Sequence, residues 1–219
     1  PKEACRCLTT LLLANECRFL NDTITLRQLA KSYKKKCALK PLSVAIPHGK
    51  FLLSGRNGVG KTTLLKILAG LEEPSEGTIE RPPWASSAAI ASDCIVYPEI
   101  LAIRELADLY VKEGKLDKNA FEQRIKHFNL TPYLSTLVGE LSTGSLQKLR
   151  LCLALASSHP LVLLDEPLNG LDNESVLVAL DEIAQEQRPM IIVDHEKRCA
   201  PHVKGKIKID DAGSCTITP

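Results

Sequence analysis

A glycine-rich segment between residues 55 and 62 has the residue types and spacing of a phosphate-binding loop. It matches the pattern G-x-x-x-x-G-K-[ST] in full, as Gly55-Arg56-Asn57-Gly58-Val59-Gly60-Lys61-Thr62. Glycines let backbone N–H groups approach phosphate oxygens, and a helix that begins at the loop favours anions at its N-terminus. Lys61 could reach the β- and γ-phosphates of a nucleotide, and the hydroxyl of Thr62 could ligate Mg²⁺. The segment therefore predicts a site for a polyphosphate and its magnesium.

Two adjacent carboxylates follow a second apolar run, 104 residues after Lys61. The run reads Leu161-Val162-Leu163-Leu164 and is followed directly by Asp165, Glu166 and Pro167. An Asp at the carboxyl end of a buried strand can hold Mg²⁺, and an adjacent Glu can act as general base on an attacking water. On its own, the pair could also be a strand that leaves the core into an acidic turn.

The elements that position these groups alternate between strands and helices. Apolar runs and period-2 patterns predict strands at residues 23–30, 42–46, 51–53, 161–164 and 190–193, and a final edge strand at 206–209. Helical patterns cover residues 62–69, 103–127 with a break at Gly114, 145–157 and 174–187, while residues 72–93 suggest loops and edge strands. This alternation predicts an α/β fold with much parallel pairing. Residues 1–22 have no clean period, and we expect them to be an N-terminal extension.

Charge and composition narrow the class of protein further. The net charge is only +2, but ten Lys and Arg lie between Arg27 and Lys66 with no acidic residue among them. The other 18 basic and 26 acidic residues give the rest of the chain a net charge of −8. Such a block suggests an anionic ligand, although a solvated basic face is equally possible.

No segment approaches the roughly 20 apolar residues of a membrane-spanning helix. The spacing of the eight cysteines favours reduced thiols over disulfides or a zinc site.

A third motif gives the pattern a family resemblance. Leu141-Ser142-Thr143-Gly144-Ser145 is similar to the signature loop L-S-G-G-Q of ATP-binding cassette (ABC) ATPases. The order of motifs is also the same: phosphate loop, signature, long helix, acidic strand, then Asn169-Gly170-Leu171-Asp172, then a strand that ends at Asp194-His195. From residue 23 to about residue 213, the chain therefore resembles an ABC nucleotide-binding domain.

The resemblance implies a fold and a set of roles. It implies a P-loop NTPase core at residues 23–97 and 145–219, with a mostly parallel sheet, an antiparallel β edge, and an inserted helical subdomain at 98–144. Thr62 and Asp165 would serve Mg²⁺, Glu166 would be the base, and His195 would contact the γ-phosphate. ATP would be held by Asn57, Gly58, Val59, Gly60, Lys61, Thr62 and Thr63. Tyr33 would stack on adenine, although it could equally be a core residue. Ser142, Gly144 and Asp172 would complete the site of a second ABC domain paired head-to-tail.

The sequence also departs from the family pattern. The signature has Thr143 for the first Gly and Ser145 for Gln. The family has a Gln that contacts Mg²⁺ between the two subdomains, whereas this chain has Ser92 or Asp93 there and no Gln between Gln28 and Gln123. We therefore expect ATP hydrolysis that is retained but slow.

These features predict the ATP-hydrolysing subunit of a transporter whose membrane-spanning subunits are separate chains. In being compact, the chain resembles the haem-exporter ATP-binding subunit of cytochrome c maturation. The alternative is a nucleotide-binding assembly or structural subunit without transport, which the missing Gln favours. Nucleic acid is not expected as a partner. We expect a peripheral position on the cytoplasmic face of a membrane or, if a transit peptide preceded Pro1, on the matrix side of the mitochondrial inner membrane.

Overall fold

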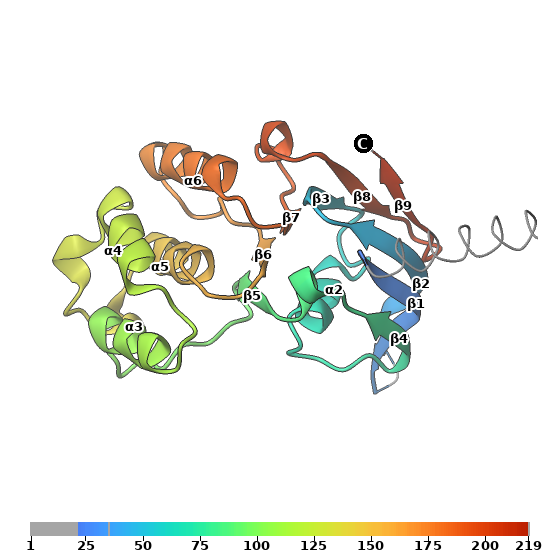
Figure 1. The fold of residues 1–219 in the computed structure, drawn as a ribbon, viewed down its shortest axis with the longest axis horizontal. Coiled ribbons are helices and arrows are strands. Elements are labelled where there is room, and N and C mark those ends of the chain that lie inside the picture. The colour runs from blue at the N-terminus through green and yellow to red at the C-terminus, as the bar shows by residue number, and fades with distance from the viewer. Residues whose placement is uncertain (1–21, 35, 219) are drawn as a thin grey trace, which may run out of the picture.

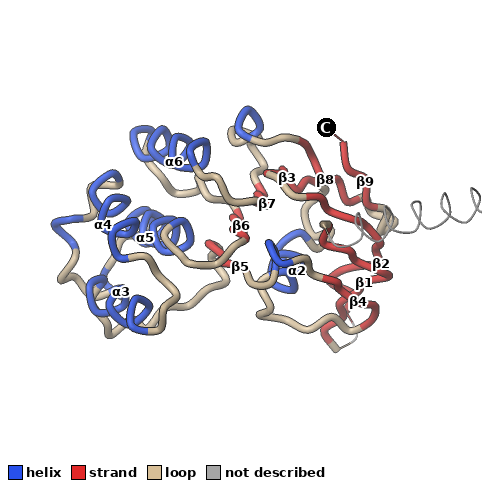
Figure 2. Tube along the Cα trace, in the orientation of Figure 1, coloured by secondary structure: helices blue, strands red, loops and turns tan. Residues whose placement is uncertain are grey.

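The computed structural model describes residues 22–34 and 36–218, so the predicted extension at 1–22 lies almost wholly outside the described residues. The chain combines strands with helices, in runs of one to three elements of the same kind (Figures 1 and 2). The strands are β1 (Thr23–Tyr33), β2 (Lys36–Pro47), β3 (Lys50–Ser54), β4 (Glu76–Glu80), β5 (Ala88–Ala91), β6 (Leu161–Asp165), β7 (Met190–Val193), β8 (Gly205–Ile209) and β9 (Cys215–Thr218). The helices are α2 (Lys61–Leu68), α3 (Ile103–Lys112), α4 (Lys118–His127), α5 (Thr143–Leu155) and α6 (Asn173–Gln185).

The larger sheet has the strand order β5-β6-β7-β3-β8-β9. Its first five strands are parallel to their neighbours, and β9 pairs antiparallel to β8. The predicted strands 51–53, 161–164 and 190–193 are its three central strands, and each is buried because both faces of the sheet are covered there. The expectation that 206–209 is the final edge strand was wrong. A turn at Asp210–Ser214 returns the chain, so β9 forms the edge instead.

The smaller sheet is antiparallel, in the order β2-β1-β4. Its inner face packs on α2 and on one face of β3 and β8, where apolar side chains of both sheets form one core. The predicted strand 42–46 is the second half of the longer β2. Figure 1 shows α2 lying between the two sheets.

The helices α3, α4 and α5 lie at the opposite end of the molecule from the smaller sheet (Figure 1). The predicted helical region 103–127 forms as α3 and α4, with Gly114 in the left-handed conformation between them. Helix α5 is buried along nearly its whole length, between α4 on one side and β5 and β6 on the other. Its side chains and those of α3, α4 and α6 share a second core with the larger sheet.

The fold brings three strand ends together at one edge of the larger sheet. Strands β6, β7 and β3 are neighbours and run in parallel, so the segments that follow them meet beyond their carboxyl ends. These segments are Asp165-Glu166, Asp194-His195 and the glycine-rich loop. Within residues 22–34 and 36–218, the structure has no helix with the length and apolarity needed to cross a membrane.

Candidate functional site

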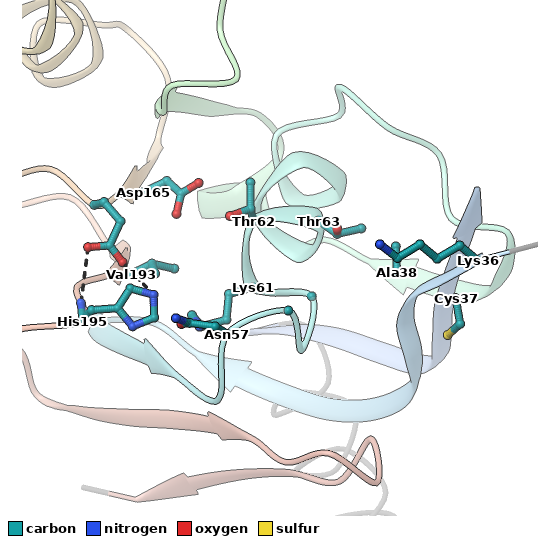
Figure 3. A pocket seen from close by; sticks show the side chains of 13 residues that line it. Lys36, Cys37, Ala38, Asn57, Lys61, Thr62, Thr63, Asp165, Val193 and His195 are labelled. Carbon is teal, nitrogen blue, oxygen red and sulfur yellow. Dashed lines mark hydrogen bonds and ion pairs between the residues drawn. The ribbon is translucent and has the colours of Figure 1, made fainter. Parts of the chain in front are cut away.

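A cavity of about 400 Å³ lies at this edge of the sheet (Figure 3). It combines the glycine-rich loop and the start of α2 with the ends of β6 and β7 and the first residues of β2. Figure 3 shows Asp165 and His195 at one end and Lys36 and Cys37 at the other. The lining residues are Lys36, Cys37, Ala38, Asn57, Gly58, Gly60, Lys61, Thr62, Thr63, Asp165, Glu166, Val193 and His195.

The conformation of the glycine-rich loop depends on Gly60, and the side chain of Lys61 is bonded to the loop backbone. Gly60 has a φ of 107°, and a Cβ there would lie 2.6 Å from the carbonyl oxygen of Ala38. The Lys61 side chain turns back and donates to the carbonyl oxygens of Gly55 at 2.9 Å and Arg56 at 3.1 Å. Burial lowers the pKa of the Lys61 ammonium, and the carboxylates of Glu166 and Asp165 oppose that shift. The ammonium is thus held inside the loop beside two carboxylates.

Two oxygen-bearing side chains could serve a divalent cation. The Thr62 hydroxyl and the Asp165 carboxylate line the same cavity and face each other in Figure 3. Hydroxyl and carboxylate oxygens are the hard ligands that Mg²⁺ prefers, and phosphate oxygens usually complete its shell. These residues therefore fit a magnesium ion that accompanies a polyphosphate.

Glu166 and His195 form a second pair at the same end of the cavity. The Glu166 carboxylate accepts a hydrogen bond from the His195 backbone N–H at 3.3 Å, and its Oε1 lies 3.2 Å from His195 Nε2. Burial raises the pKa of the Glu166 carboxyl, His195 opposes this, and the neighbouring carboxylates of Asp194 and Asp165 add to it. A half-buried carboxylate of raised pKa, next to an imidazole, is suited to accepting a proton.

Several residues that hold the acidic segment were not predicted. The Ser92 hydroxyl donates to Asp165 Oδ2 at 3.0 Å, so one of the two residues considered for the position of the expected Gln touches the predicted metal ligand. On α5, Gln147 donates to the backbone carbonyl of Glu166, and Arg150 pairs with Asp93. The one signal in the sequence is that Gln147 and Arg150, together with Lys148, are polar residues within the largely apolar stretch 146–156.

The other predicted site residues lie outside the cavity lining. Tyr33 ends β1, 41% exposed, with the Lys31 ammonium 5.2 Å from its ring centroid. It pairs across the hairpin with Lys36, which does line the cavity. The predicted partner-facing residues lie at helix starts: Ser142 caps α5, Asp172 caps α6, and Gly144 is in the first turn of α5.

The basic block is only partly at the cavity. Lys36 and Lys61 line it, but Arg27 pairs with Glu80, Lys31 with Glu72, and the Lys50 ammonium with carbonyl oxygens at the end of α6. The described residues of this block are therefore not all gathered at the cavity. Its residues lie on different strands and faces, so their charges are spread over the molecule.

Comparison with known families identifies the fold and its class of chemistry. A sequence model described as "ABC transporter" matches residues 39–169, more than half of the chain. The chain belongs to the ABC transporter family. The match includes the glycine-rich loop, the signature segment and the acidic strand end.

Curated relatives are 26% to 32% identical to this chain over the aligned residues. The chain is 26% identical over 200 residues to the zinc uptake system ATP-binding protein ZurA of Listeria innocua, covering 81% of this chain and 78% of that protein. It is 32% identical over 175 residues to the phosphonates import ATP-binding protein PhnC 1 of Natronomonas pharaonis, covering 71% and 74%. Other relatives are much longer: the chain spans 56% of the putrescine transport ATP-binding protein PotG of Escherichia coli, at 28% identity over 89% of this chain.

Solved structures have the same fold. The chain superposes on a structure titled as the ATP binding subunit of an ABC transporter with a TM-score of 0.74 and 22% identity, covering 90% of this chain and 89% of that one. For the dimeric structure of MJ0796, a bacterial ABC transporter cassette, the TM-score is 0.72 at 20% identity, covering 87% and 95%. The predicted α/β P-loop NTPase fold is confirmed.

Proposed function

We propose that this chain binds and hydrolyses ATP as the nucleotide-binding subunit of an ABC transporter, working with separate membrane-spanning subunits. One observation carries the proposal: a single cavity brings together Lys61, Thr62, Asp165, Glu166 and His195 from three segments distant in sequence. The family membership and the import ATPases among the relatives support it.

In this proposal, the loop binds the phosphate groups. Backbone N–H groups of residues 58–63 and the Lys61 ammonium would hold phosphate oxygens. The ammonium now donates to the Gly55 and Arg56 carbonyls, and these contacts would give way to phosphate. Asn57, which lines the cavity, would contact the nucleotide, whereas Val59 is not in the lining and would only shape the loop. A magnesium ion held by Thr62 and Asp165 would supply charge neutralisation to the transferred phosphoryl group.

The chemical step needs a base and a contact to the γ-phosphate. Glu166 would accept a proton from the attacking water, because its carboxylate lies in the cavity and, among the described residues, forms an ion pair with His195 but with no lysine or arginine. His195 would donate to the γ-phosphate from Nε2, the nitrogen that now lies next to Glu166. Water and γ-phosphate would thus meet between two side chains that already touch.

The remaining predicted residues have roles at the two ends of the nucleotide. Tyr33 would stack on adenine, since its hairpin partner Lys36 lies at the end of the cavity opposite Asp165 (Figure 3). Ser142, Gly144 and Asp172 would face the nucleotide of a second cassette, as expected for a head-to-tail pair. Support for pairing comes from the related cassette whose solved structure is dimeric.

An apolar groove supports a membrane partner over a purely structural role. The groove encloses about 310 Å³ between the end of α2, the edge strand β5 and helix α3, with Ile95, Tyr97 and Tyr110 in its lining. Next to it, Val96 and Ile100 are 84% and 82% exposed. Exposed apolar side chains around a groove are typical of a protein-binding surface, here for a helix of a transporter subunit.

The ATPase part is tested by turnover. Purified chain with Mg-ATP should hydrolyse ATP at least about 100-fold faster than its Glu166→Gln variant, because a general base contributes 10²–10⁴-fold. Both proteins should bind ATP with similar affinity. Equal rates in the two would reject hydrolysis and favour the alternative of a nucleotide-binding assembly subunit.

The transporter part is tested at the groove. A Val96→Asp/Ile100→Asp double variant should lose co-purification with membrane subunits and keep ATP binding. The control is Leu177→Asp, a single exposed leucine on α6. Co-purification that survives the double variant would contradict docking at this groove.

Three narrower predictions stay open within this proposal. Haem export is one of them, although the relatives reported above carry the names of zinc, phosphonate and putrescine systems. The membrane face, cytoplasmic or mitochondrial matrix, is another. The third is the division of the chain into a core at 23–97 and 145–219 and a helical subdomain at 98–144.

A further inference from the structure

Helix α5 carries two buried polar side chains on an otherwise apolar surface. Gln147 is 3% and Arg150 is 7% exposed. Their spacing of three residues places them on one face of the helix, the face toward the acidic segment after β6. Burying an amide and a guanidinium is unfavourable unless their hydrogen-bonding groups are used, so their partners indicate why they are there.

The two side chains determine each other's orientation. Arg150 Nη1 lies 3.3 Å from Gln147 Oε1 and donates to it. Gln147 Nε2 therefore faces the other way and donates to the backbone carbonyls of Glu166 at 3.2 Å and Pro167 at 3.1 Å. In the flipped amide, oxygen would face two carbonyl oxygens and NH₂ would face a guanidinium. Arg150 thus selects the orientation of Gln147 that can hold the acidic segment.

The carbonyl that Gln147 holds belongs to a residue in an unfavourable backbone conformation. Glu166 has a φ of 51°, in the left-handed region that side-chain-bearing residues avoid. This conformation directs its carboxylate toward His195. Such a residue keeps its conformation only where its surroundings hold it, and the Gln147 amide is one of the groups that do so.

The segment between β5 and α3 contacts both the acidic segment after β6 and Arg150 on α5. Ser92 donates to Asp165, and Asp93, whose side chain is 81% exposed, forms an ion pair with Arg150. Further along, the same segment lines the apolar groove with Ile95 and Tyr97. A shift of this segment would therefore move the anionic partner of Arg150.

We propose that Gln147 and Arg150 are positioning residues that hold Glu166 in its working conformation, and that Asp93 makes this hold depend on the segment between β5 and α3. The arrangement joins the groove to the base by side chains of this chain, at the place where the family pattern has its missing Gln. The inference rests on the proposed ATPase function.

The first test separates positioning from nucleotide binding. Gln147→Glu replaces the donor NH₂ by an acceptor, and Arg150→Met removes the guanidinium. Each should lower kcat by about 10- to 100-fold, because a small misplacement of a catalytic group has effects of that size. The dissociation constant of a non-hydrolysable ATP analogue should change less than about twofold. An equal loss in both quantities would overturn the proposal.

Matched variants control for the loss of a buried arginine. Arg124 also forms a largely buried ion pair, with Glu182, but it does so between α4 and α6. Arg124→Met should therefore leave kcat within about twofold of the unmodified chain once folded protein is compared. Arg150→Lys, which keeps a cation but not the planar fork, should recover part of the activity lost in Arg150→Met.

The link to Asp93 is tested by a double-mutant cycle. Asp93→Asn alone should lower kcat and, because the side chain is exposed, leave the fold intact. In the Arg150→Met background it should have no further effect. Additive losses in kcat would show that Asp93 acts independently and would overturn its place in the proposal.

A readout without turnover separates this inference from the proposed function. If the unmodified chain hydrolyses no ATP, the proposed ATPase fails, and hydrogen exchange then decides the positioning role. The amide of Asn169 donates to the Glu166 carbonyl, next to the Gln147 contact. Its exchange should be faster in Gln147→Glu and Arg150→Met than in Arg124→Met. Equal exchange in all three would overturn the proposal.

Discussion

At the scale of single residues, the cavity holds opposite charges whose pKa values are shifted by the same cause. Burial lowers the pKa of Lys61 and raises that of Glu166, so each charged form is less stable here than in water. The negative charge of a bound polyphosphate would stabilise the charged form of Lys61, in addition to the carboxylates of Glu166 and Asp165. We therefore expect nucleotide binding to stabilise the folded chain against unfolding, by an amount set by the affinity and concentration of the nucleotide.

Gly60 should not tolerate a side chain. In Gly60→Ala, a left-handed φ and a Cβ 2.6 Å from the Ala38 carbonyl oxygen act together. We expect ATP binding to be lost and stability to fall by more than the 1–3 kcal/mol of backbone strain alone. Gly70→Ala is the control, since its φ is 72° but no described heavy atom lies within 4 Å of the added Cβ. Urea unfolding and nucleotide titration measure both; equal destabilisation in the two variants would contradict the steric account.

Asp172 should stabilise the fold only above strongly acidic pH. Its carboxylate accepts from the Ser175 N–H at the start of α6 and pairs with Lys148, which together lower its pKa from 3.8 to about 2. Because the native pKa is the lower one, this stabilisation is complete above the unfolded value and is lost as the pH falls through about 2. Asp172→Ala should therefore melt below the unmodified chain at pH 7, and the difference should shrink between pH 4 and pH 2. A pH-independent difference would argue against it.

At the scale of elements, the larger sheet is stabilised by contacts that hold the segment between α5 and β6. Arg188, just before β7, donates to the carbonyl oxygens of Leu155, Ser157 and His159, which end α5 and lead into β6. It also pairs with Glu186. One guanidinium thus satisfies the Leu155 carbonyl, which the end of α5 leaves without a helical partner, and two carbonyl groups in the segment that follows the helix.

Removing Arg188 should destabilise the molecule strongly. Arg188→Met leaves the Glu186 carboxylate and three carbonyl groups without this donor, and breaking such a buried pair costs about 3–5 kcal/mol. Arg198→Met is the control, because the Arg198–Glu196 pair is exposed and is expected to contribute less than about 1 kcal/mol. Urea unfolding at unchanged m-value measures both. Similar small losses would mean that the carbonyl groups find other donors.

The elements that could be predicted from sequence are those with continuous apolar runs. Strands β3, β6 and β7 and the second half of helix α5 are such runs, and the chemistry at the ends of these elements follows from contiguous motifs. Strand β9 has only a short alternating pattern, so its position at the sheet edge depends on a turn. Ser92 lies 73 residues from Asp165, and Asp93 lies 57 from Arg150, so only packing brings them together. No local pattern encodes such contacts.

At the scale of the whole molecule, the residues of the expected site are in two groups. The cavity lining holds the loop, the carboxylates and His195, whereas Ser142 and Asp172 lie at the starts of α5 and α6. If two copies pair head-to-tail, each site takes one group from each chain, and mixing two inactive variants should restore activity.

The mixing experiment uses Lys61→Ala and Ser142→Asp. Aspartate retains the helix cap at residue 142 and adds a negative charge that would repel the partner's γ-phosphate. In an equal mixture, half of the pairs are mixed and each has one intact site, so about a quarter of normal turnover is expected. Each variant alone is the control and should be inactive. A mixture as inactive as its components would contradict pairing of this kind.

The position of Cys37 gives the chain a built-in reporter. Its thiol is exposed and lines the cavity at the end away from Asp165, whereas Cys152 and Cys199 are buried. A bound nucleotide would cover this sulfur without needing it for chemistry. Alkylation of Cys37, resolved from the other cysteines by peptide mass, should therefore slow as ATP is added. The ATP concentration that gives half of the full protection would be the dissociation constant of ATP for the protein without any attached dye.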